Sequence, residues 1–172
     1  MESQRKRLFI GLMADTGVQR ALLRHQLCWS WPAGARLTPA AKMHLTLQFL
    51  GLVDEDEVEK LKHAVAAIRF QPFDLVLCRN GTFADNIAWV APERSPSLVD
   101  LHQMVTSATR EVGILANEEW TPHVTLARRS AGALLPAVNP AITWMVREVG
   151  LVLSERGTYR QILSSPAAAP VH

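Results

Sequence analysis

The chain has 172 residues, 48% of them hydrophobic, which suits the core of one compact domain and is too little sequence for two ordinary domains. With 18 Lys and Arg against 16 Asp and Glu, the net charge of +2 excludes a histone-like polycation and a highly charged disordered tail. Cys28 and Cys78 stand far apart without a CxxC motif, which argues against a zinc framework and a disulfide scaffold and favours a reducing compartment.

The beginning of the chain lacks the pattern of an export signal. The apolar stretch that follows the basic residues 5–7 covers only residues 8–14 before Asp15 interrupts it. No apolar run approaches the roughly 20 residues that a membrane-spanning helix needs. We therefore expect a soluble, cytoplasmic protein without membrane contact, folded as one domain over residues 1–172 with a frayed tail from about residue 165.

The first third of the chain predicts two strands that alternate with two helices. Residues 8–13 form a short apolar run typical of a buried strand, and a capping-box pattern at Thr16 and Gln19 opens a helix through about Trp29. Residues 43–50 alternate, with His44, Thr46 and Gln48 on the polar face of a strand. A second capping-box pattern, Asp54 and Glu57, predicts a helix over residues 55–68.

The remaining sequence predicts five strands and one helix. Strands over residues 73–77 and 86–90 are joined by a turn-rich segment that contains Asn80-Gly81 and Asp85-Asn86. Ser95-Pro96 starts a helix that Gly113 ends. The last strands are expected over residues 124–129, 142–154, with a bend near Gly150, and 158–163.

One motif occurs twice, and the two copies carry the chemistry. His44-Leu45-Thr46-Leu47 and His123-Val124-Thr125-Leu126 are His-x-Thr-Leu segments that fall one in each half of the chain. Strand alternation places the histidine and the threonine of each copy on one face and the aliphatic residues on the other. If the two strands adjoin one groove, two imidazoles and two hydroxyl groups converge there.

Paired imidazoles suit a reaction in which one proton is removed and another is delivered near neutral pH. Phosphodiester hydrolysis is such a reaction, because water loses a proton, the leaving alkoxide gains one, and the phosphoryl oxygens need stabilisation. Thr46, Thr125 and Arg128 can supply that stabilisation, and the planar guanidinium group matches a phosphate. A metal site is the rival interpretation of the histidines, but further ligands at recognisable spacing are missing.

The two motifs, extended as HLTLQF and HVTLAR, resemble those of the two-histidine (2H) phosphoesterases, specifically the bacterial RNA 2′,3′-cyclic phosphodiesterase (LigT-like, or ThpR-like) branch. The Leu-Phe-Ile strand near the start, Phe-Leu-Gly after the first motif and Thr-Pro-His before the second extend the resemblance over most of the chain. It implies an α+β fold of two pseudo-symmetric lobes, each an antiparallel sheet with external helices, with one His-x-Thr motif per lobe facing a central groove.

The same resemblance implies roles for six residues. His44 is the general acid toward the ribose leaving oxygen, and His123 is the general base toward water. Thr46 and Thr125 bind phosphoryl oxygens, Arg128 clamps the phosphate, and Phe49 stacks on the terminal base. The implied substrate is an RNA end or nucleotide with a 2′,3′-cyclic phosphate, hydrolysed to a 2′-phosphomonoester without metal or other cofactor. We expect the protein to be a monomer.

Several alternatives remain open at this level. The threonines are also common β-branched strand residues, and Phe49 could belong to the core. The same groups, catalysing the reverse reaction, would ligate RNA through 2′–5′ bonds. A non-catalytic nucleotide-binding module could also keep the groove without the chemistry. Trp120 is the tryptophan closest to His123 and the candidate for a groove contact. An RNA path and a solvated face are both compatible with seven basic residues, namely Arg5, Lys6, Arg7, Arg36, Lys42, Arg156 and Arg160.

Overall fold

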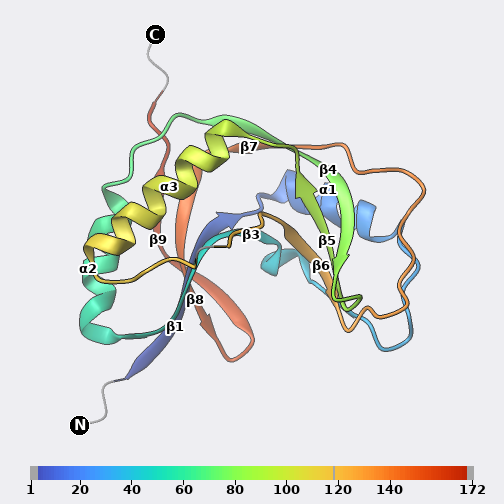
Figure 1. Ribbon diagram of the computed structural model, residues 1–172, viewed down its shortest axis with the longest axis horizontal. Helices are drawn as coiled ribbons and strands as arrows, with labels where there is room; N and C mark the ends of the chain where they lie inside the picture. Colours follow the sequence, from blue (N-terminus) through green and yellow to red (C-terminus); the bar gives the residue numbers. More distant parts are fainter. Residues whose placement is uncertain (1–3, 118, 170–172) are drawn as a thin grey trace.

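One curled antiparallel sheet organises the computed structural model, which describes residues 4–117 and 119–169 (Figure 1). Its strand order is β7-β4-β5-β6-β3-β1-β8-β9, and β2 pairs with β6 beside this path. The strands are β1 (Arg5–Met13), β2 (Arg36–Leu37), β3 (His44–Asp54), β4 (Phe73–Phe83), β5 (Ile87–Pro92), β6 (Val124–Arg128), β7 (Ile142–Val146), β8 (Glu148–Glu155) and β9 (Thr158–Pro166). The helices are α1 (Thr16–Gln26), α2 (Glu55–Ala66) and α3 (Pro96–Glu111), and a 3-10 turn, η1, covers Ala40–Lys42.

The sheet consists of two four-stranded lobes that meet at the motif strands. The middle lobe, β7-β4-β5-β6, comes from the central part of the chain, whereas the terminal lobe, β3-β1-β8-β9, combines strands from both ends of the chain. β3 and β6 adjoin at one residue pair, Leu45 and Val124, each of which lies inside a His-x-Thr motif. The expected α+β fold with one motif per lobe is thereby confirmed.

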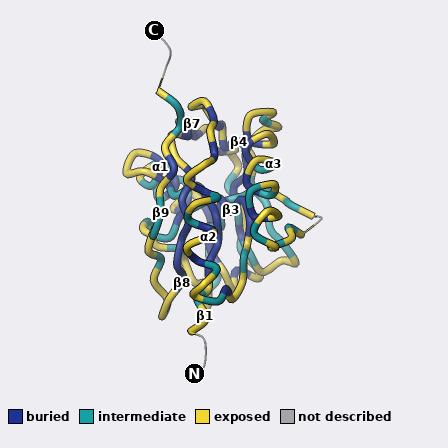
Figure 2. Tube along the Cα trace, turned by 90° about the vertical axis from the view of Figure 1, so that its left-hand side faces the viewer, coloured by how far each residue is buried: buried dark blue, intermediate teal, exposed yellow. Residues whose placement is uncertain are grey.

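Two helices, α1 and α3, pack on a different lobe from the strand that precedes them in sequence, whereas α2 stays on the lobe of β3. α2 and α3 lie against each other over the terminal lobe, where α2 contacts β9, β8 and β3 and α3 contacts β3, whereas α1 packs on β7 of the middle lobe (Figure 1). Each helix buries one apolar stripe, and Figure 2 shows the buried residues concentrated along the strands under these helices. None of the described helices has the length and apolar character needed to cross a bilayer.

Two of the predicted helix caps differ from the structure. Asp15, one residue before the predicted Thr16, caps α1 by accepting a hydrogen bond from the Val18 amide at 2.9 Å. Asp54 occupies the N-cap position of α2, but its carboxylate accepts a hydrogen bond from Arg5 Nε at 3.2 Å and makes no cap bond. Ser95 does cap α3, as expected, through the Leu98 amide at 3.2 Å.

Two bulges change the alternation of β3. In its pairing with β1, Gln48 lies opposite Ile10 and Thr46 opposite Gly11, so Leu47 is an extra residue, and Leu50 is skipped in the same way. The expectation that Gln48 shares the open face of His44 and Thr46 is wrong. Its side chain is 5% exposed and accepts a hydrogen bond from Thr109 of α3 at 2.7 Å.

The expected long strand over residues 142–154 is two strands, and the break lies at Arg147 instead of Gly150. β7 pairs with β4 at one edge of the sheet, whereas β8 pairs with β1 and β9 near the other edge, so the chain must leave one lobe between them. The expected frayed tail is also wrong up to residue 168. β9 continues to Pro166, and the Ala168 amide donates to the Phe70 carbonyl at 2.8 Å; residues 170–172 lie outside the described residues.

The turn predicted around Asn80-Gly81 is instead continuous strand, because β4 runs on to Phe83 and the chain reverses at Ala84 and Asp85.

Gly81 is required in β4 by packing, since a Cβ atom at this position would lie 2.2 Å from Cζ2 of Trp89. We expect Gly81→Ala to lower the free energy of unfolding by about 1–3 kcal/mol through overpacking. Denaturant unfolding measures this, with Gly34→Ala as the control, because a Cβ at Gly34 would meet no described residue within 4 Å apart from its two chain neighbours.

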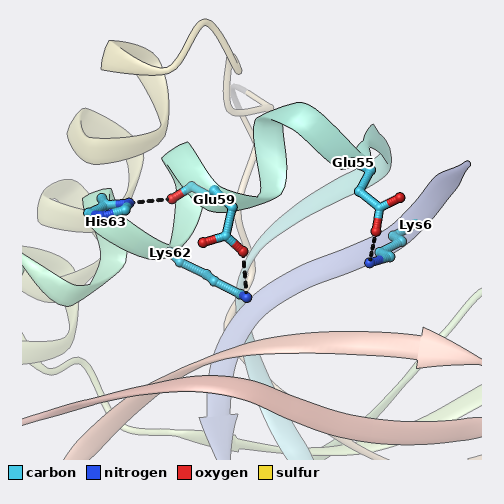
Figure 3. A network of polar contacts seen from close by, with 5 residues as sticks. All are labelled: Lys6, Glu55, Glu59, Lys62 and His63. Atoms are coloured by element: carbon cyan, nitrogen blue, oxygen red, sulfur yellow. Dashed lines mark hydrogen bonds and ion pairs between the residues drawn. The ribbon is translucent and has the colours of Figure 1, made fainter. Parts of the chain in front are cut away.

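Exposed ion pairs connect the start of α2 to β1. The pair that connects them joins Lys6 Nζ of β1 to the carboxylate of Glu55 at 2.8 Å (Figure 3). A second pair, between Lys62 Nζ and the carboxylate of Glu59 at 2.7 Å, lies within α2. The hydrogen bond from Lys62 and its positive charge lower the pKa of Glu59. Because these groups face solvent, salt screens them and they add little to stability.

Candidate active site

The two motif strands open onto one cavity of about 410 Å³, which we call the motif cavity. It lies where β3 meets β6, so both motifs contribute to its walls. All six residues assigned from the sequence line this cavity, namely His44, Thr46, Phe49, His123, Thr125 and Arg128. Residues separated by 79 positions are therefore brought together by the sheet topology.

Both histidines are anchored in the same way. His44 Nδ1 donates to the carbonyl oxygen of Lys42 at 2.6 Å, and His123 Nδ1 donates to that of Thr121 at 2.8 Å. Because a carbonyl oxygen only accepts, the proton of each neutral ring sits on Nδ1. The Nε2 atom of each ring is then the atom that exchanges protons, and that of His44 lies 3.1 Å from the Thr46 hydroxyl oxygen.

The surroundings of both histidines favour the neutral imidazole. Burial lowers the pKa of His44 most strongly, the hydrogen bond to Lys42 opposes this change, and the charges of His123 and Arg128 lower the pKa further. Burial also lowers the pKa of His123, with a smaller contribution from Arg128. A bound phosphate would supply the negative charge that this cationic cavity lacks.

Aromatic rings hold both imidazoles from the side. The His44 ring lies 4.6 Å from the ring of Phe9 and 5.3 Å, edge to face, from that of Tyr159. The His123 ring lies 4.8 Å, also edge to face, from Phe83. These contacts restrict the rotation of both rings, so the Nε2 atoms keep a fixed direction.

Three cationic side chains line the motif cavity. Arg36 of β2 lies opposite Arg128 of β6 in the strand ladder, and Lys42 lies at the end of η1. The described residues of its walls include no Asp or Glu. Arg129 is absent from these walls and follows β6 with a φ of 52°, so only one of the two adjacent arginines lines the cavity.

Phe49 does not belong to the core. Its side chain is 65% exposed and lines the motif cavity, and the nearest aromatic ring, that of Phe9, lies at 6.3 Å. The bulge at Leu47 causes this position, because strict alternation from Thr46 would turn Phe49 to the opposite face. An exposed ring beside the histidines is available for stacking on a base.

Tyr159 and Phe83 were not assigned from the sequence, although both line the motif cavity. Each stands in a strand without a motif of its own. Tyr159 reaches the site only because β9 pairs with β8, and β8 is itself separated from β3 by β1. Lys42 Nζ lies 5.2 Å from the centre of the Tyr159 ring, which holds this cation over the site. No spacing in the sequence could have shown this contact.

Trp120, the candidate for a groove contact, is absent from the walls of the motif cavity but bonds to the first motif. Its indole Nε1 donates to the main-chain carbonyl of Thr46 at 3.0 Å, so the segment before the second motif is bonded to the first motif. Among the described residues, no group of three or more His, Cys, Asp or Glu side chains is placed to hold a metal ion.

This arrangement supplies a proton donor, a proton acceptor and a cluster of cations and hydroxyl groups within one cavity. A phosphoryl group bound in this cavity would share it with Thr46, Thr125 and Arg128. These groups suit a displacement at phosphorus in which one proton is removed and another is delivered.

Comparison with known proteins agrees with this interpretation. Residues 33–158 match the 2′-5′ RNA ligase superfamily. A Thermus thermophilus protein named RNA 2′,3′-cyclic phosphodiesterase is 30% identical over 166 residues, covering 87% of this chain and 82% of that protein. An Escherichia coli protein of the same name is 27% identical, with 83% and 82% covered. The crystal structure of E. coli LigT in its apo form superposes with a TM-score of 0.83 at 26% identity, covering 97% of this chain and all of that one. The chain therefore belongs to the 2′-5′ RNA ligase superfamily of 2H phosphoesterases.

Proposed function

We propose that this protein hydrolyses the 2′,3′-cyclic phosphate at an RNA end and leaves a 2′-phosphomonoester and a free 3′-hydroxyl group. The observation that carries the proposal is the convergence of two anchored imidazoles, two threonines and Arg128 on one cavity. Two relatives that this chain matches over most of their length carry the name RNA 2′,3′-cyclic phosphodiesterase, which supports the proposal.

The reaction follows from the roles of the two Nε2 atoms. Neutral His123 removes a proton from water as the water oxygen forms a bond to phosphorus, and the bond from phosphorus to O3′ breaks on the opposite side. Protonated His44 delivers its proton to O3′, so the two histidines exchange protonation states over one turnover. Thr46, Thr125 and Arg128 hold the phosphoryl oxygens while negative charge develops on them.

The assignment of the acid to His44 follows from the resemblance to the RNA 2′,3′-cyclic phosphodiesterases, and the position of Phe49 is compatible with it. Both residues belong to β3, and both line the motif cavity. A base stacked on Phe49 places its own ribose on the β3 side of the cavity, where His44 faces the leaving oxygen. His123, on the opposite side of the phosphate, then faces the attacking water. In this scheme all the reacting groups come from a single two-lobed domain, and we propose that it works as a monomer in the cytoplasm.

One assay tests the function directly. The protein is incubated in EDTA with an RNA that ends in a 2′,3′-cyclic phosphate, and 2′- and 3′-phosphate ends are separated by chromatography. We expect complete conversion to the 2′-phosphate. A predominantly 3′-phosphate product would reverse the orientation, whereas activity that is lost in EDTA and restored by a divalent ion would overturn the metal-free reaction. Binding without turnover would indicate a nucleotide-binding module, and joined RNA a ligase.

The pH dependence of kcat/KM is expected to be bell-shaped. Loss of activity at low pH reflects protonation of the base His123, and loss at high pH reflects deprotonation of the acid His44. Since the pKa of each imidazole is lowered by burial, both limbs shift to the acidic side of the ordinary value of 6.5. The two apparent pKa values belong to the coupled pair. Initial rates on a cyclic mononucleotide across the pH range measure the profile, and a flat profile would contradict it.

Phe49→Ala is expected to weaken substrate binding by about 1–3 kcal/mol with little change in stability, because the exposed ring stacks on a base and is not part of the core. The dissociation constant for a nucleotide and the midpoint of thermal unfolding separate these effects. Leu52→Ala is the matched control, since Leu52 is a 55% exposed apolar residue of the same strand outside the motif cavity. Lower stability with unchanged affinity would make Phe49 a packing residue.

A further inference from the structure

A second cavity, of about 340 Å³, adjoins the motif cavity, and we call it the aromatic cavity. The two cavities share Thr46, Phe49, Phe83 and His123 as walls. The other walls of the aromatic cavity come chiefly from the segment that leads to the second motif, with His102 contributed by α3 and two residues by β3, and they include Asn117, Glu119 and Trp120. A molecule that leaves the motif cavity past Phe49 therefore enters a space that the proposed reaction does not use.

A rigid pair of rings forms the far wall of this cavity. The rings of His102 and Trp120 are stacked with centroids 3.8 Å apart and planes only 3° from parallel. The hydrogen bond from Trp120 Nε1 to the Thr46 carbonyl fixes the position of the indole relative to the first motif. Both side chains remain partly exposed. Flat rings held in place beside a nucleotide site are typical of surfaces on which successive bases pack.

Trp120 also borders a third hollow, of about 510 Å³, which we call the arginine groove. Arg79 and Arg94 line it, together with Glu93, Ser95 and Pro122. Arg79 is held by donation to the Pro92 carbonyl at 3.1 Å, and Arg94 is exposed. The ion pairs within the described part of the chain involve neither arginine. Two guanidinium groups beyond an aromatic wall match the phosphate that follows a base along a nucleic-acid strand.

We propose that these two hollows bind the RNA strand on the 5′ side of the reacting nucleotide. This inference rests on the proposed function, because it takes the reacting cyclic phosphate to lie in the motif cavity. The strand can continue only through the 5′ oxygen of the terminal ribose. The base of the preceding nucleotide packs in the aromatic cavity against Trp120, and the phosphate on the 5′ side of that nucleotide binds Arg79 and Arg94. The protein thus recognises the last two nucleotides of the RNA together with the phosphate on their 5′ side.

A series of short substrates tests each step. The series consists of a cyclic mononucleotide, a dinucleotide with the same cyclic end, the same dinucleotide with a 5′-phosphate, and that phosphorylated dinucleotide without its first base. We expect kcat/KM to rise on the order of 10-fold when the second nucleotide is added and again by a similar factor when the 5′-phosphate is added. Removing the first base should reverse the first gain and keep the second.

Substitutions assign the second gain to the arginine groove. Arg79→Gln combined with Arg94→Gln should abolish the gain from the 5′-phosphate, and the slope of log kcat/KM against log salt should flatten by about 0.7 for the lost phosphate contact. Turnover of the cyclic mononucleotide by each variant is the internal reference. Arg110→Gln is the control, since Arg110 is an exposed arginine near the other end of α3 and is absent from the walls of all three hollows.

Equal kcat/KM for all four substrates would overturn this inference while leaving the proposed function intact, because the mononucleotide would still react. A 5′-phosphate gain that persists in the double variant would overturn the assignment to Arg79 and Arg94. Failure of the proposed function has a different signature, namely no hydrolysis of any member of the series.

Discussion

Replacement of either motif histidine by glutamine is expected to lower kcat/KM by about 10²–10⁴-fold. The amide group of glutamine reaches the position of Nε2 and keeps a polar group in the cavity, but it cannot transfer a proton. The loss in the double variant should be far smaller than the product of the two single losses, because the acid and the base act in the same step. Single-turnover rates on a cyclic nucleotide provide the measurement.

His63→Gln is the matched control for these variants. His63 is an exposed histidine of α2 that also bonds to a main-chain carbonyl, that of Glu59 at 2.7 Å (Figure 3). It is absent from the walls of the motif cavity. Residual activity adds a second readout, since the His123 variant should lose the acidic limb of the pH profile and the His44 variant the alkaline limb. A variant that retains a near-normal rate would remove that histidine from the reaction.

Arg128→Lys is expected to lower kcat by about 10²–10³-fold although the positive charge is kept. An ammonium group cannot form the two parallel hydrogen bonds with which a guanidinium group holds two phosphoryl oxygens. The variant is compared with the parent protein in steady-state assays, with thermal unfolding as a check that the fold is intact. Because Arg128 is exposed at the end of β6, its replacement should leave stability almost unchanged.

Arg129→Lys is the control for this effect. The two arginines are adjacent and both exposed, but only Arg128 lines the motif cavity. The control should therefore retain full activity. If Arg128→Lys and Arg129→Lys behave alike and both turn over substrate normally, Arg128 is a surface cation, and Arg36 and Lys42 would be the next candidates for the phosphate contact.

The parts of the site that the sequence predicted are those governed by local periodicity. Alternation within a strand places His44 and Thr46 on one face, and the same holds for His123 and Thr125. The motif is repeated, so its two copies could be paired before the topology was known. Arg128 was assigned without geometry because it continues the second motif beyond Thr125.

The parts that the sequence did not predict depend on contacts between distant segments. The bulge at Leu47 is set by the pairing of β3 with β1, and it turns Gln48 inward and Phe49 outward. Tyr159 is placed by the pairing of β9 with β8. The break at Arg147 arises because neighbouring apolar stretches pair at opposite ends of the sheet, which their composition alone does not reveal.

The exchange of helices between the lobes has a consequence for the folding of the chain. α1 is synthesised early but packs on β7, and β1 is synthesised early but pairs with β8. Both lobes therefore depend on contacts between segments that are more than 100 residues apart in sequence. Contacts between such distant segments slow folding. During synthesis on the ribosome, the middle lobe cannot complete its core before β7 is made, and the terminal lobe cannot do so before β8 is made. We therefore expect no catalytically competent intermediate before β8 has emerged. Enzymatic activity of the nascent chain should therefore appear late and in a single step, as a direct report of completed folding.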